Sequence, residues 1–443
     1  MIRATQSREI ILDILLEVLE RGAQSHRVLR QALDKYQYLE KQDRALITRV
    51  AEGTIEYRLT IDAVLKQCSS VPVKKMKPVI RTILRMSVYQ LLWMDRIPDS
   101  AVCNEAVKLA ASRRFQNLKG YVNGVLRSIA RQKEQFVFAD WERRYSMPQW
   151  LIDRWRDSYD DATVEAMLEA FLRPVPTTVR CNRTLAEEET IIESLCAQGV
   201  RVEKSCFGGG LLTLEHYDYL ESLEAFANGW IQVQDAGGAL VALAAAPQPG
   251  ERVLDVCGAP GGKSLQIADL LDGRGEVTVR DLTEEKLALV EDNLARTGFT
   301  NVHTQVWDAR IFDESWQEGA DLVIADLPCS GLGVIGRKPE IKYQASPERI
   351  KELAALQREI LTVAARYVRP GGRLVYSTCT ISTEENEEQR AWFLKTQPFR
   401  SVDIRGRLGE MIREDSLKDG YVQLFPGRYP CDGFFISVFE RDK

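Results

Sequence analysis

The chain is short of histidine, of paired cysteine motifs and of long apolar runs, and each shortage excludes a class of protein. Its three histidines (His26, His216 and His303) lie far apart, and its nine cysteines form no Cys-x-x-Cys motif. We therefore expect no metal site and no disulfide framework. No apolar stretch is long enough to span a bilayer, and the first residues lack the apolar core of a secretory signal. The composition predicts a cytoplasmic protein with reduced thiols and no membrane partner.

Charge is unevenly distributed along the chain, although the net charge of −5 is small. Residues 1–145 carry 26 Lys and Arg against 16 Asp and Glu, a net charge of +10, so the remainder carries −15. A basic first third on an acidic body favours a module that binds a polyanion such as a nucleic acid. The alternative is ordinary surface charge on solvated helix faces.

The apolar pattern divides the 443 residues into three parts. Helical spacing runs through residues 1–145, for example from Val79 to Leu92, and predicts an all-α bundle. Residues 146–235 mix short strand and helix patterns, which predicts a small α+β connector. From 236 to 443, strands alternate with helices, which predicts a parallel sheet covered on both faces and a final antiparallel hairpin.

Two cysteines stand where buried strands are expected to end. Cys329 follows an apolar run that starts at Asp321, and Cys379 follows one that starts at Arg373. A third run ends in the glycine-rich loop Cys257-Gly-Ala-Pro-Gly-Gly-Lys263. Ligands bind beyond the carboxyl ends of parallel strands, so we expect both thiols in one crevice beside this loop. Thiols in such a place suggest covalent catalysis.

The loop is compatible with more than one ligand. Its end, Gly262-Lys263-Ser264, matches a phosphate-binding loop, which leaves a P-loop-like NTPase as an alternative. Against this, Cys257 replaces the first glycine and Pro260 removes a backbone N–H group that would hold phosphate.

Two acidic residues after the next strands favour a ligand with a ribose. Asp281 can accept both ribose hydroxyls, and Asp308 lies where an adenine amino group could be held. A glycine-rich loop with these two acids describes a site for S-adenosyl-L-methionine. The alternative roles of Asp281 and Asp308 are helix capping and turn formation.

The two thiols fit the chemistry of pyrimidine methylation. A thiolate that adds to C6 of the ring makes C5 nucleophilic, so that C5 can accept a methyl group. Asp326, three residues before Cys329, is placed to contact the ring N3 or its amino group and must then carry or share a proton. The base must also leave its stack. These arguments do not decide which of the two cysteines attacks.

Three motifs resemble the signature motifs of RNA cytosine-C5 methyltransferases. They are Asp326-Leu-Pro-Cys329-Ser-Gly-Leu-Gly333, Thr378-Cys379 followed by Glu384-Glu385-Asn386, and the loop from Cys257 to Lys263. The basic helical start resembles the transcription antitermination factor NusB. The resemblance covers essentially the whole chain. It implies an α/β Rossmann-like class I methyltransferase domain, preceded by an all-α NusB-like bundle and the α+β connector.

The resemblance also implies roles for single residues. Cys379 would be the nucleophile, and Cys329 would help to release the product. The implied contacts to S-adenosyl-L-methionine are Cys257, Gly258, Ala259, Pro260, Gly261, Gly262, Lys263, Asp281, Asp308 and Asp326.

The implied substrate is cytosine 967 of 16S rRNA, either free or in an early small-subunit assembly intermediate, and we expect a monomer. A catalytically vestigial RNA-binding protein of ribosome assembly is a further alternative. Departures from the family pattern are Gly258 and Leu327, where alanine is frequent, and Gly336, where a basic residue is common.

Overall fold

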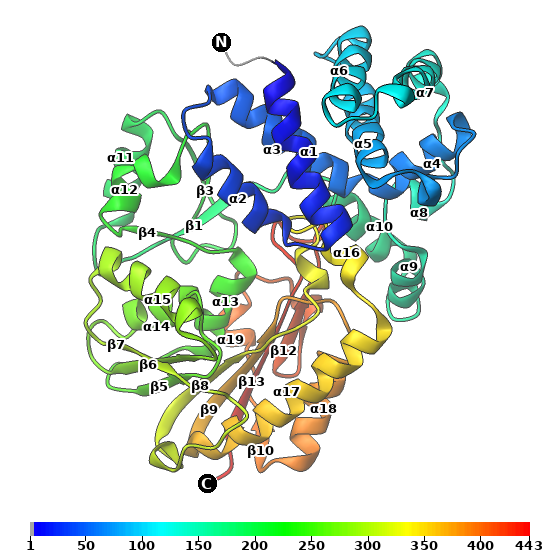
Figure 1. Ribbon diagram of the computed structural model, residues 1–443. Helices are drawn as coiled ribbons and strands as arrows, with labels where there is room; N and C mark the ends of the chain where they lie inside the picture. The colour runs from blue at the N-terminus through cyan, green and yellow to red at the C-terminus, as the bar shows by residue number, and fades with distance from the viewer. Residues whose placement is uncertain (1–3) are drawn as a thin grey trace. The chain divides into compact units, whose positions relative to one another are not determined.

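The computed structural model describes residues 4–443 and contains two compact units (Figure 1). The first comprises the chain up to Arg173 together with Ile335–Gln344, and the second comprises Pro174–Val334 and Ala345–Lys443. The chain therefore passes between the units three times. The limits at residues 145 and 235 stay a prediction. Among the described residues, no helix combines the length and apolar character needed to cross a bilayer.

The first unit is built of helices, as its apolar spacing predicts. Its helices are α1 (Ala4–Arg21), α2 (Ser25–Lys35), α3 (Lys41–Glu56), α4 (Arg58–Cys68), α5 (Pro78–Trp93), α6 (Asp99–Ser112), α7 (Lys119–Gln132), α8 (Trp141–Arg144), α9 (Gln149–Arg156), α10 (Asp161–Ala170) and α16 (Ile341–Gln344), with a 3₁₀ turn η1 (Val73–Lys75).

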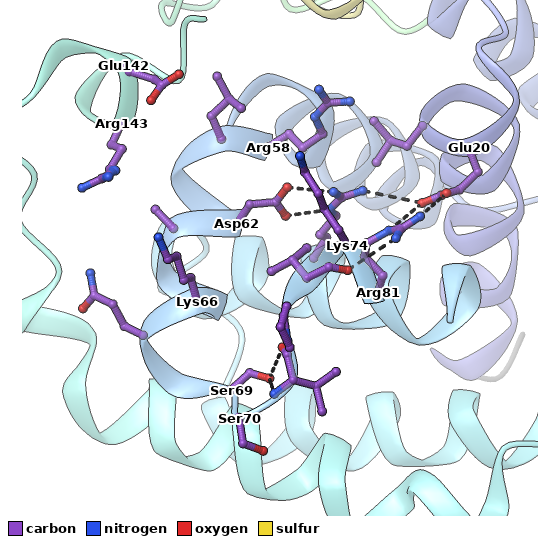
Figure 2. Close-up of a pocket in the computed structure, with 18 residues that line it drawn as sticks. Glu20, Arg58, Asp62, Lys66, Ser69, Ser70, Lys74, Arg81, Glu142 and Arg143 are labelled. Carbon is purple, nitrogen blue, oxygen red and sulfur yellow. Dashed lines mark hydrogen bonds and ion pairs between the residues drawn. The ribbon is translucent and has the colours of Figure 1, made fainter. Parts of the chain in front are cut away.

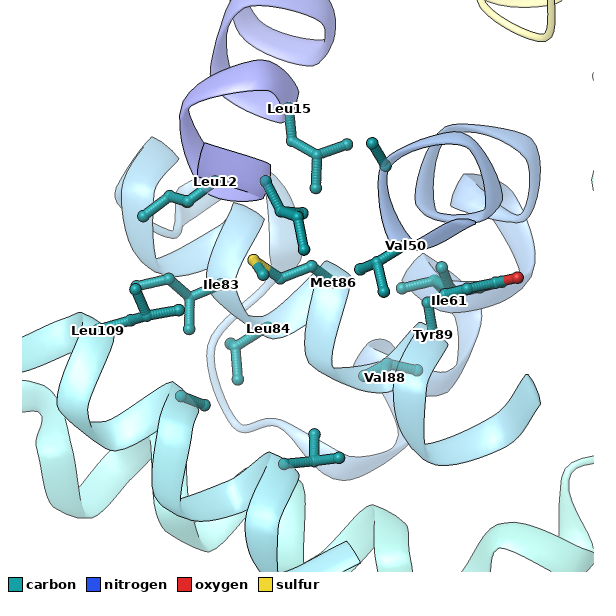
Figure 3. Close-up of a cluster of buried hydrophobic side chains, with 14 of the residues drawn as sticks. Leu12, Leu15, Val50, Ile61, Ile83, Leu84, Met86, Val88, Tyr89 and Leu109 are labelled. Carbon is teal, nitrogen blue, oxygen red and sulfur yellow. The ribbon is translucent and has the colours of Figure 1, made fainter. Parts of the chain in front are cut away.

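Helix α5 is the centre of this unit. It begins at Pro78, where the missing N–H and fixed φ of proline suit a first helical position. Almost every residue from Ile80 to Leu91 is buried, so the helix is covered on all sides. Figure 3 shows its side chains packed among Leu12 and Leu15 of α1, Val50 of α3 and Leu109 of α6.

A short segment from the second half of the sequence, Ile335–Gln344, belongs to the helical unit. The Glu340 carboxylate accepts hydrogen bonds from the Ser25 N–H at 2.9 Å and from its hydroxyl at 2.7 Å. The fully buried Lys342 donates to the Glu56 carbonyl oxygen at 2.8 Å, across 286 positions of sequence. The apolar pattern of the sequence did not predict these contacts.

The second unit contains two sheets, of which the smaller is antiparallel with the strand order β2-β3-β1-β4. Its elements are β1 (Thr177–Cys181), α11 (Glu188–Ala197), β2 (Arg201–Lys204), β3 (Leu211–Glu215), α12 (Glu224–Ala227) and β4 (Ile231–Val233). The structure contains the mixture of short strands and helices that the sequence predicted for this part. Strand β4 was not predictable, because three residues carry too little periodicity.

The larger sheet has the order β11-β12-β13-β9-β8-β5-β6-β7, with β10 beside β13. Its strands are β5 (Arg252–Asp255), β6 (Glu276–Asp281), β7 (Val302–Val306), β8 (Ala320–Asp326), β9 (Val368–Thr378), β10 (Phe399–Ser401), β11 (Leu417–Lys418), β12 (Tyr421–Leu424) and β13 (Phe434–Arg441). Strands β5 to β9 are parallel, whereas β13 pairs antiparallel with β9 and β12. The predicted α/β sheet with a C-terminal antiparallel hairpin is confirmed.

Helices cover both faces of this sheet (Figure 1). They are α13 (Ala236–Ala245), α14 (Gly262–Leu270), α15 (Glu284–Thr297), α17 (Pro347–Tyr367), α18 (Glu387–Thr396) and the short α19 (Arg405–Leu408). Successive residues of β8 point to opposite faces: Leu322 and Ile324 pack in the core that contains α13 and α14, and Val323 and Ala325 pack in the core that contains α17. The strand order reverses direction between β5 and β8, and such a switch point is where α/β sheets bind ligands.

Candidate active site

The ends of five parallel strands bring the predicted site residues to one edge of the large sheet. The loop from Cys257 to Lys263 follows β5, Asp281 ends β6, and Asp308 follows β7. Asp326 ends β8 three residues before Cys329, and Cys379 follows the last residue of β9.

Two glycines shape the loop after β5. A Cβ on Gly258 would lie 2.5 Å from Cγ1 of Val279 and 2.8 Å from Cγ of Asp255, so only glycine fits. An alanine at this position would therefore require Val279 and Asp255 to shift. Gly261 has φ +99°, a conformation that favours glycine, and it directly precedes α14.

Two carboxylates stand beside this loop. Asp281 accepts hydrogen bonds from the Leu282 N–H at 2.7 Å, from Lys286 Nζ at 2.8 Å and from the Ala259 N–H at 3.3 Å. Asp281 therefore ties the end of β6 to the loop. Asp308 accepts from the backbone and guanidinium of Arg310, and this hydrogen bonding lowers the pKa of the Asp308 carboxyl group.

Asp326 is joined to the loop by an ion pair. Its Oδ2 lies 2.6 Å from Lys263 Nζ, and its Oδ1 accepts a hydrogen bond from Ser377 Oγ at 2.7 Å. Burial lowers the pKa of the Lys263 ammonium, but the Asp326 carboxylate outweighs burial, so the net pKa is raised. The ion pair places a protonated ammonium beside Asp326, and the proton that the sequence predicts Asp326 to carry or share stays a prediction.

The two predicted thiols are in direct contact. Sγ of Cys329 lies 3.3 Å from Sγ of Cys379, and both side chains are half-buried. The hydrogen bond to Cys379 and burial raise the pKa of the Cys329 thiol well above its ordinary value. At neutral pH the Cys329 thiol therefore keeps its proton and lies beside the sulfur of Cys379.

A buried glutamate, whose role the sequence did not predict, holds the loop that carries Cys329. Glu385 accepts hydrogen bonds from the Ser330 N–H at 2.8 Å, from the Ser330 hydroxyl and from Gln357 at 3.1 Å. Burial raises the pKa of the Glu385 carboxyl, although the hydrogen bonds from Ser330 oppose this shift. Ser330 Oγ also lies 2.7 Å from Oγ1 of Thr380, which links the loops after β8 and β9.

Asn386 holds the loop that carries Cys379. Its amide donates to the Thr380 carbonyl at 3.1 Å and to Gln423 at 2.7 Å, and its oxygen accepts from the Thr378 hydroxyl at 2.6 Å. The motif quoted from the sequence contains Glu385 and Asn386, but only the structure shows what they support.

Two further groups below the loop are buried. Burial raises the pKa of Asp255 to about 7, and its carboxyl accepts a hydrogen bond from Ser264. Burial also raises the pKa of Cys257, which keeps this residue a neutral thiol. Cys257 is therefore suited to a packing role in the loop rather than to nucleophilic attack.

This combination of fold and site defines a class of protein. The parallel sheet has a switch point between β5 and β8 and an antiparallel strand beside β9. A glycine-rich loop follows β5, and an acid ends the next strand, β6. Together these features are the architecture of class I methyltransferases. The predicted Rossmann-like fold is confirmed. The engagement of Lys263 by Asp326 does not favour the P-loop alternative, because the ammonium already has a carboxylate partner.

Comparisons with known proteins identify the family. Family models match consecutive parts of the chain: the NusB family over residues 5–131, a ferredoxin-like domain of RsmF/B-like methyltransferases over 147–218, and 16S rRNA methyltransferase RsmB/F over 242–440. The chain is 36% identical to a probable ribosomal RNA small subunit methyltransferase B of Bacillus subtilis, over 99% of both proteins. It is 31% identical to the ribosomal RNA small subunit methyltransferase B of Proteus mirabilis, over 98% of both. The chain therefore belongs to the ribosomal RNA small subunit methyltransferase B family.

Solved structures agree with this assignment. The crystal structure of PH0851 is similar with a TM-score of 0.83 and 29% identity, over 100% of this chain and 99% of that chain. A methyltransferase homolog protein from Pyrococcus horikoshii has a TM-score of 0.59 and 26% identity, over 68% of this chain and 98% of that chain. The protein is an S-adenosyl-L-methionine-dependent RNA methyltransferase, and the predicted resemblance is confirmed.

Proposed function

We propose that this enzyme methylates C5 of cytosine 967 in 16S rRNA through a covalent bond between Cys379 and the ring. The observation that carries the proposal is the contact of two thiols, 3.3 Å apart, at the strand ends that also hold Asp326. Direct methyl transfer needs no thiol, whereas the covalent route uses one to attack and a second group to assist release. The proposed substrate is free 16S rRNA or an early small-subunit assembly intermediate, and the proposed active form is a monomer.

The residues around the loop fit S-adenosyl-L-methionine. When bound, this molecule supplies a methyl group activated by a sulfonium. Asp281 would accept the ribose hydroxyls, Asp308 would accept the adenine amino group, and the loop from Cys257 to Lys263 would contact the methionine part. Leu282 directly follows Asp281, and Ile311 lies three residues after Asp308. Their side chains leave 56% and 58% of their surface exposed and would offer apolar cover for an adenine ring.

Cys379 would start the reaction by adding to C6 of the cytosine. As the S–C6 bond forms, the electrons of the C5=C6 double bond would move toward N3, and the Asp326–Lys263 pair would supply the compensating proton. C5 would then bond to the methyl carbon while the bond between that carbon and the sulfonium sulfur breaks, and the electron pair of the broken bond would stay on sulfur. Loss of the C5 proton to a base and cleavage of the S–C6 bond restore the ring and return the Cys379 thiolate.

Cys329 would act in the release of the product. Its pKa is raised well above the ordinary value by its hydrogen bond to Cys379, so it is a neutral thiol beside the attacking sulfur. A thiol in this position stabilises the thiolate that leaves the ring.

We expect Cys379→Ala to abolish methylation and Cys329→Ala to accumulate a covalent RNA–protein complex. The measurement is denaturing gel electrophoresis after incubation with 16S rRNA and S-adenosyl-L-methionine. Cys196→Ala, at an exposed thiol, is the matched control and should behave like the parent. A complex that requires Cys329 and forms without Cys379 would refute the proposed division of roles.

The target nucleotide needs a separate test. Methylcytosine is mapped in 16S rRNA from a strain that lacks this protein, with and without complementation by the parent and by Cys379→Ala. We expect the mark at cytosine 967 to disappear and to return only with the parent.

A further inference from the structure

The helical unit contains a large open groove whose role the methyltransferase reaction does not explain. The groove has a volume of about 1060 Å³ and lies among the end of α1, helix α4, the turn from Ser69 to Lys74, helix α5 and helix α8. All of its walls come from the helical unit. Figure 2 shows Lys66 and Arg143 on one side and Glu20 and Arg81 on the other.

Part of the charge in this groove is already neutralised. Arg81 forms an ion pair with Glu20. Arg85 donates twice to Asp62, each time at 2.7 Å, and lies 3.6 Å from Glu20. These arginines are therefore held by the protein itself and form a fixed wall.

The remaining cations of the groove point to an external anion. Lys66 and Lys74 are exposed, and within residues 4–443 neither has an ion-pair partner. Arg143 has a single weak acidic neighbour, Asp140 at 3.5 Å. The groove walls carry six basic against three acidic residues, a surplus of three positive charges, within the most basic part of the chain. A surplus of positive charge around a concave surface attracts a polyanion.

The groove also offers apolar surface between its charges. Leu19, Leu59, Val71 and Pro72 line it, and the hydroxyl of the exposed Ser70 lies at its edge. A nucleic-acid strand has this mixed character, because charged phosphates alternate with sugars and bases that pack on apolar side chains. A purely acidic peptide would make no contact with these apolar side chains.

We propose that this groove binds the sugar–phosphate backbone of the substrate RNA, with Lys66 and Lys74 contacting phosphates. The inference rests on the proposed function, since it takes the RNA substrate as the polyanion. The groove is then an anchoring site built from residues of the helical unit, which holds the RNA without reading its sequence.

The test is Lys66→Gln/Lys74→Gln in the full chain, measured with a fragment of 16S rRNA around the target. We expect RNA affinity to fall roughly tenfold at 0.1 M salt, and the slope of log affinity against log salt to decrease by about 2. KM for RNA should rise while kcat at saturating RNA stays unchanged, because neither lysine belongs to the strand ends that carry the reacting groups. Both lysines are exposed, so the melting temperature should not change.

The matched control is Arg96→Gln/Lys119→Gln, which removes two exposed positive charges from the same unit outside the groove. Equal loss of affinity in both double variants would overturn the groove as a site and would leave only diffuse attraction. Unchanged RNA affinity together with loss of binding to polyglutamate would overturn RNA as the ligand and assign an acidic protein.

Failure of the proposed function gives a different pattern. If the chain does not methylate this RNA, the parent shows no methyl transfer at any RNA concentration, whatever the binding assay reports. If only the groove proposal fails, the parent methylates normally and the groove variant retains the KM of the parent.

Discussion

Asp255 illustrates how burial changes the chemistry of a single residue near the cofactor loop. Its carboxyl is fully buried beneath Gly258, and burial raises its pKa to about 7 from an ordinary value of 3.8. The folded protein therefore holds this proton more tightly than the unfolded chain. The stabilising contribution is complete below about pH 4 and is lost as the pH rises toward about 7.

We expect Asp255→Asn to remove this part of the pH dependence. Relative to the parent, the variant should gain stability between pH 5 and pH 8, by at most about 3 kcal/mol, because asparagine never ionises. The measurement is thermal and denaturant unfolding at both pH values.

Asp403→Asn is the control for this experiment. The hydrogen bond from Arg405 lowers the pKa of the exposed Asp403 to about 2, so this residue is ionised at both pH values. The stability difference between Asp403→Asn and the parent should therefore be the same at pH 5 and at pH 8. A parent-like pH dependence of Asp255→Asn would show that Asp255 ionises normally.

Single residues of the site were predictable where their placement depends on local sequence. Cys329, Cys379 and Asp326 each stand at the end of an apolar run. Since the carboxyl ends of parallel strands lie at the same edge of a sheet, this position predicts that the three residues share one edge. Ser377 was not predictable as a partner of Asp326, because the two lie 51 positions apart and meet only through the pairing of β8 with β9.

The two thiols stay in contact only if the loops that carry them keep their relative positions. The loop after β8 carries Cys329 and the loop after β9 carries Cys379, and Glu385 holds the first through Ser330. Gly333 adds a close contact, since a Cβ there would lie 2.0 Å from the Gly433 carbonyl oxygen.

We expect Glu385→Ala to lower kcat roughly 100-fold, because a displacement of about 1 Å at reacting groups costs this much. Its effect on the Kd of S-adenosyl-L-methionine should be small, since Glu385 contacts the loop after β8 rather than the loop after β5. The reaction rate of Cys379 with a thiol reagent should also change, and loss of stability alone would not cause this.

Glu388→Ala, at an exposed position on α18, is the matched control and should retain parental activity. If Glu385→Ala keeps the parental kcat, the loops do not depend on this carboxylate for their positions.

Most strands of the large sheet were predictable, because parallel strands buried on both faces give continuous apolar runs. The edge strands β10 and β11 were not, since three and two residues give no periodic signal. The long apolar runs therefore predicted the centre of the sheet, and the structure was needed for its edge.

At the scale of the whole molecule, Lys342 has an unusual environment. Burial lowers the pKa of its ammonium to about 7, although the neighbouring Glu56 carboxylate opposes the shift. Tyr343 next to it donates to the Ile55 carbonyl at 2.9 Å, and the Arg58 guanidinium lies 3.5 Å from the centre of its ring. These contacts fix the segment Ile335–Gln344 in the helical unit.

We expect Lys342→Met to destabilise the helical unit by about 3 kcal/mol, because it leaves the Glu56 carboxylate and carbonyl without their buried partner. Adding Glu56→Gln should recover part of this loss, which a double-mutant cycle would measure. Hydrogen exchange of residues 335–344 should become faster in the single variant. Lys119→Met, at an exposed position, should change neither quantity; slow exchange of the segment in Lys342→Met would contradict its anchoring role.

The sequence indicated the basic character of the first third and a helical fold for it. It did not indicate that residues 335–344 complete this unit, because contacts across hundreds of positions leave no periodic pattern. The groove lined by Lys66 and Lys74 was equally hidden, since the charge count does not show which cations are already paired.

The position of residues 335–344 has a consequence for inheritance. The segment begins six residues after Cys329, so a stretch that folds with the helical unit is encoded inside the catalytic half of the gene. A single crossover at the junction of the two units would separate Glu340 and Lys342 from Ser25 and Glu56. The buried Glu340 carboxylate and Lys342 ammonium would then lack these hydrogen-bond partners. The helical unit and the catalytic unit must therefore diverge together, and a lineage that discards the first would also have to rewrite this stretch of the second.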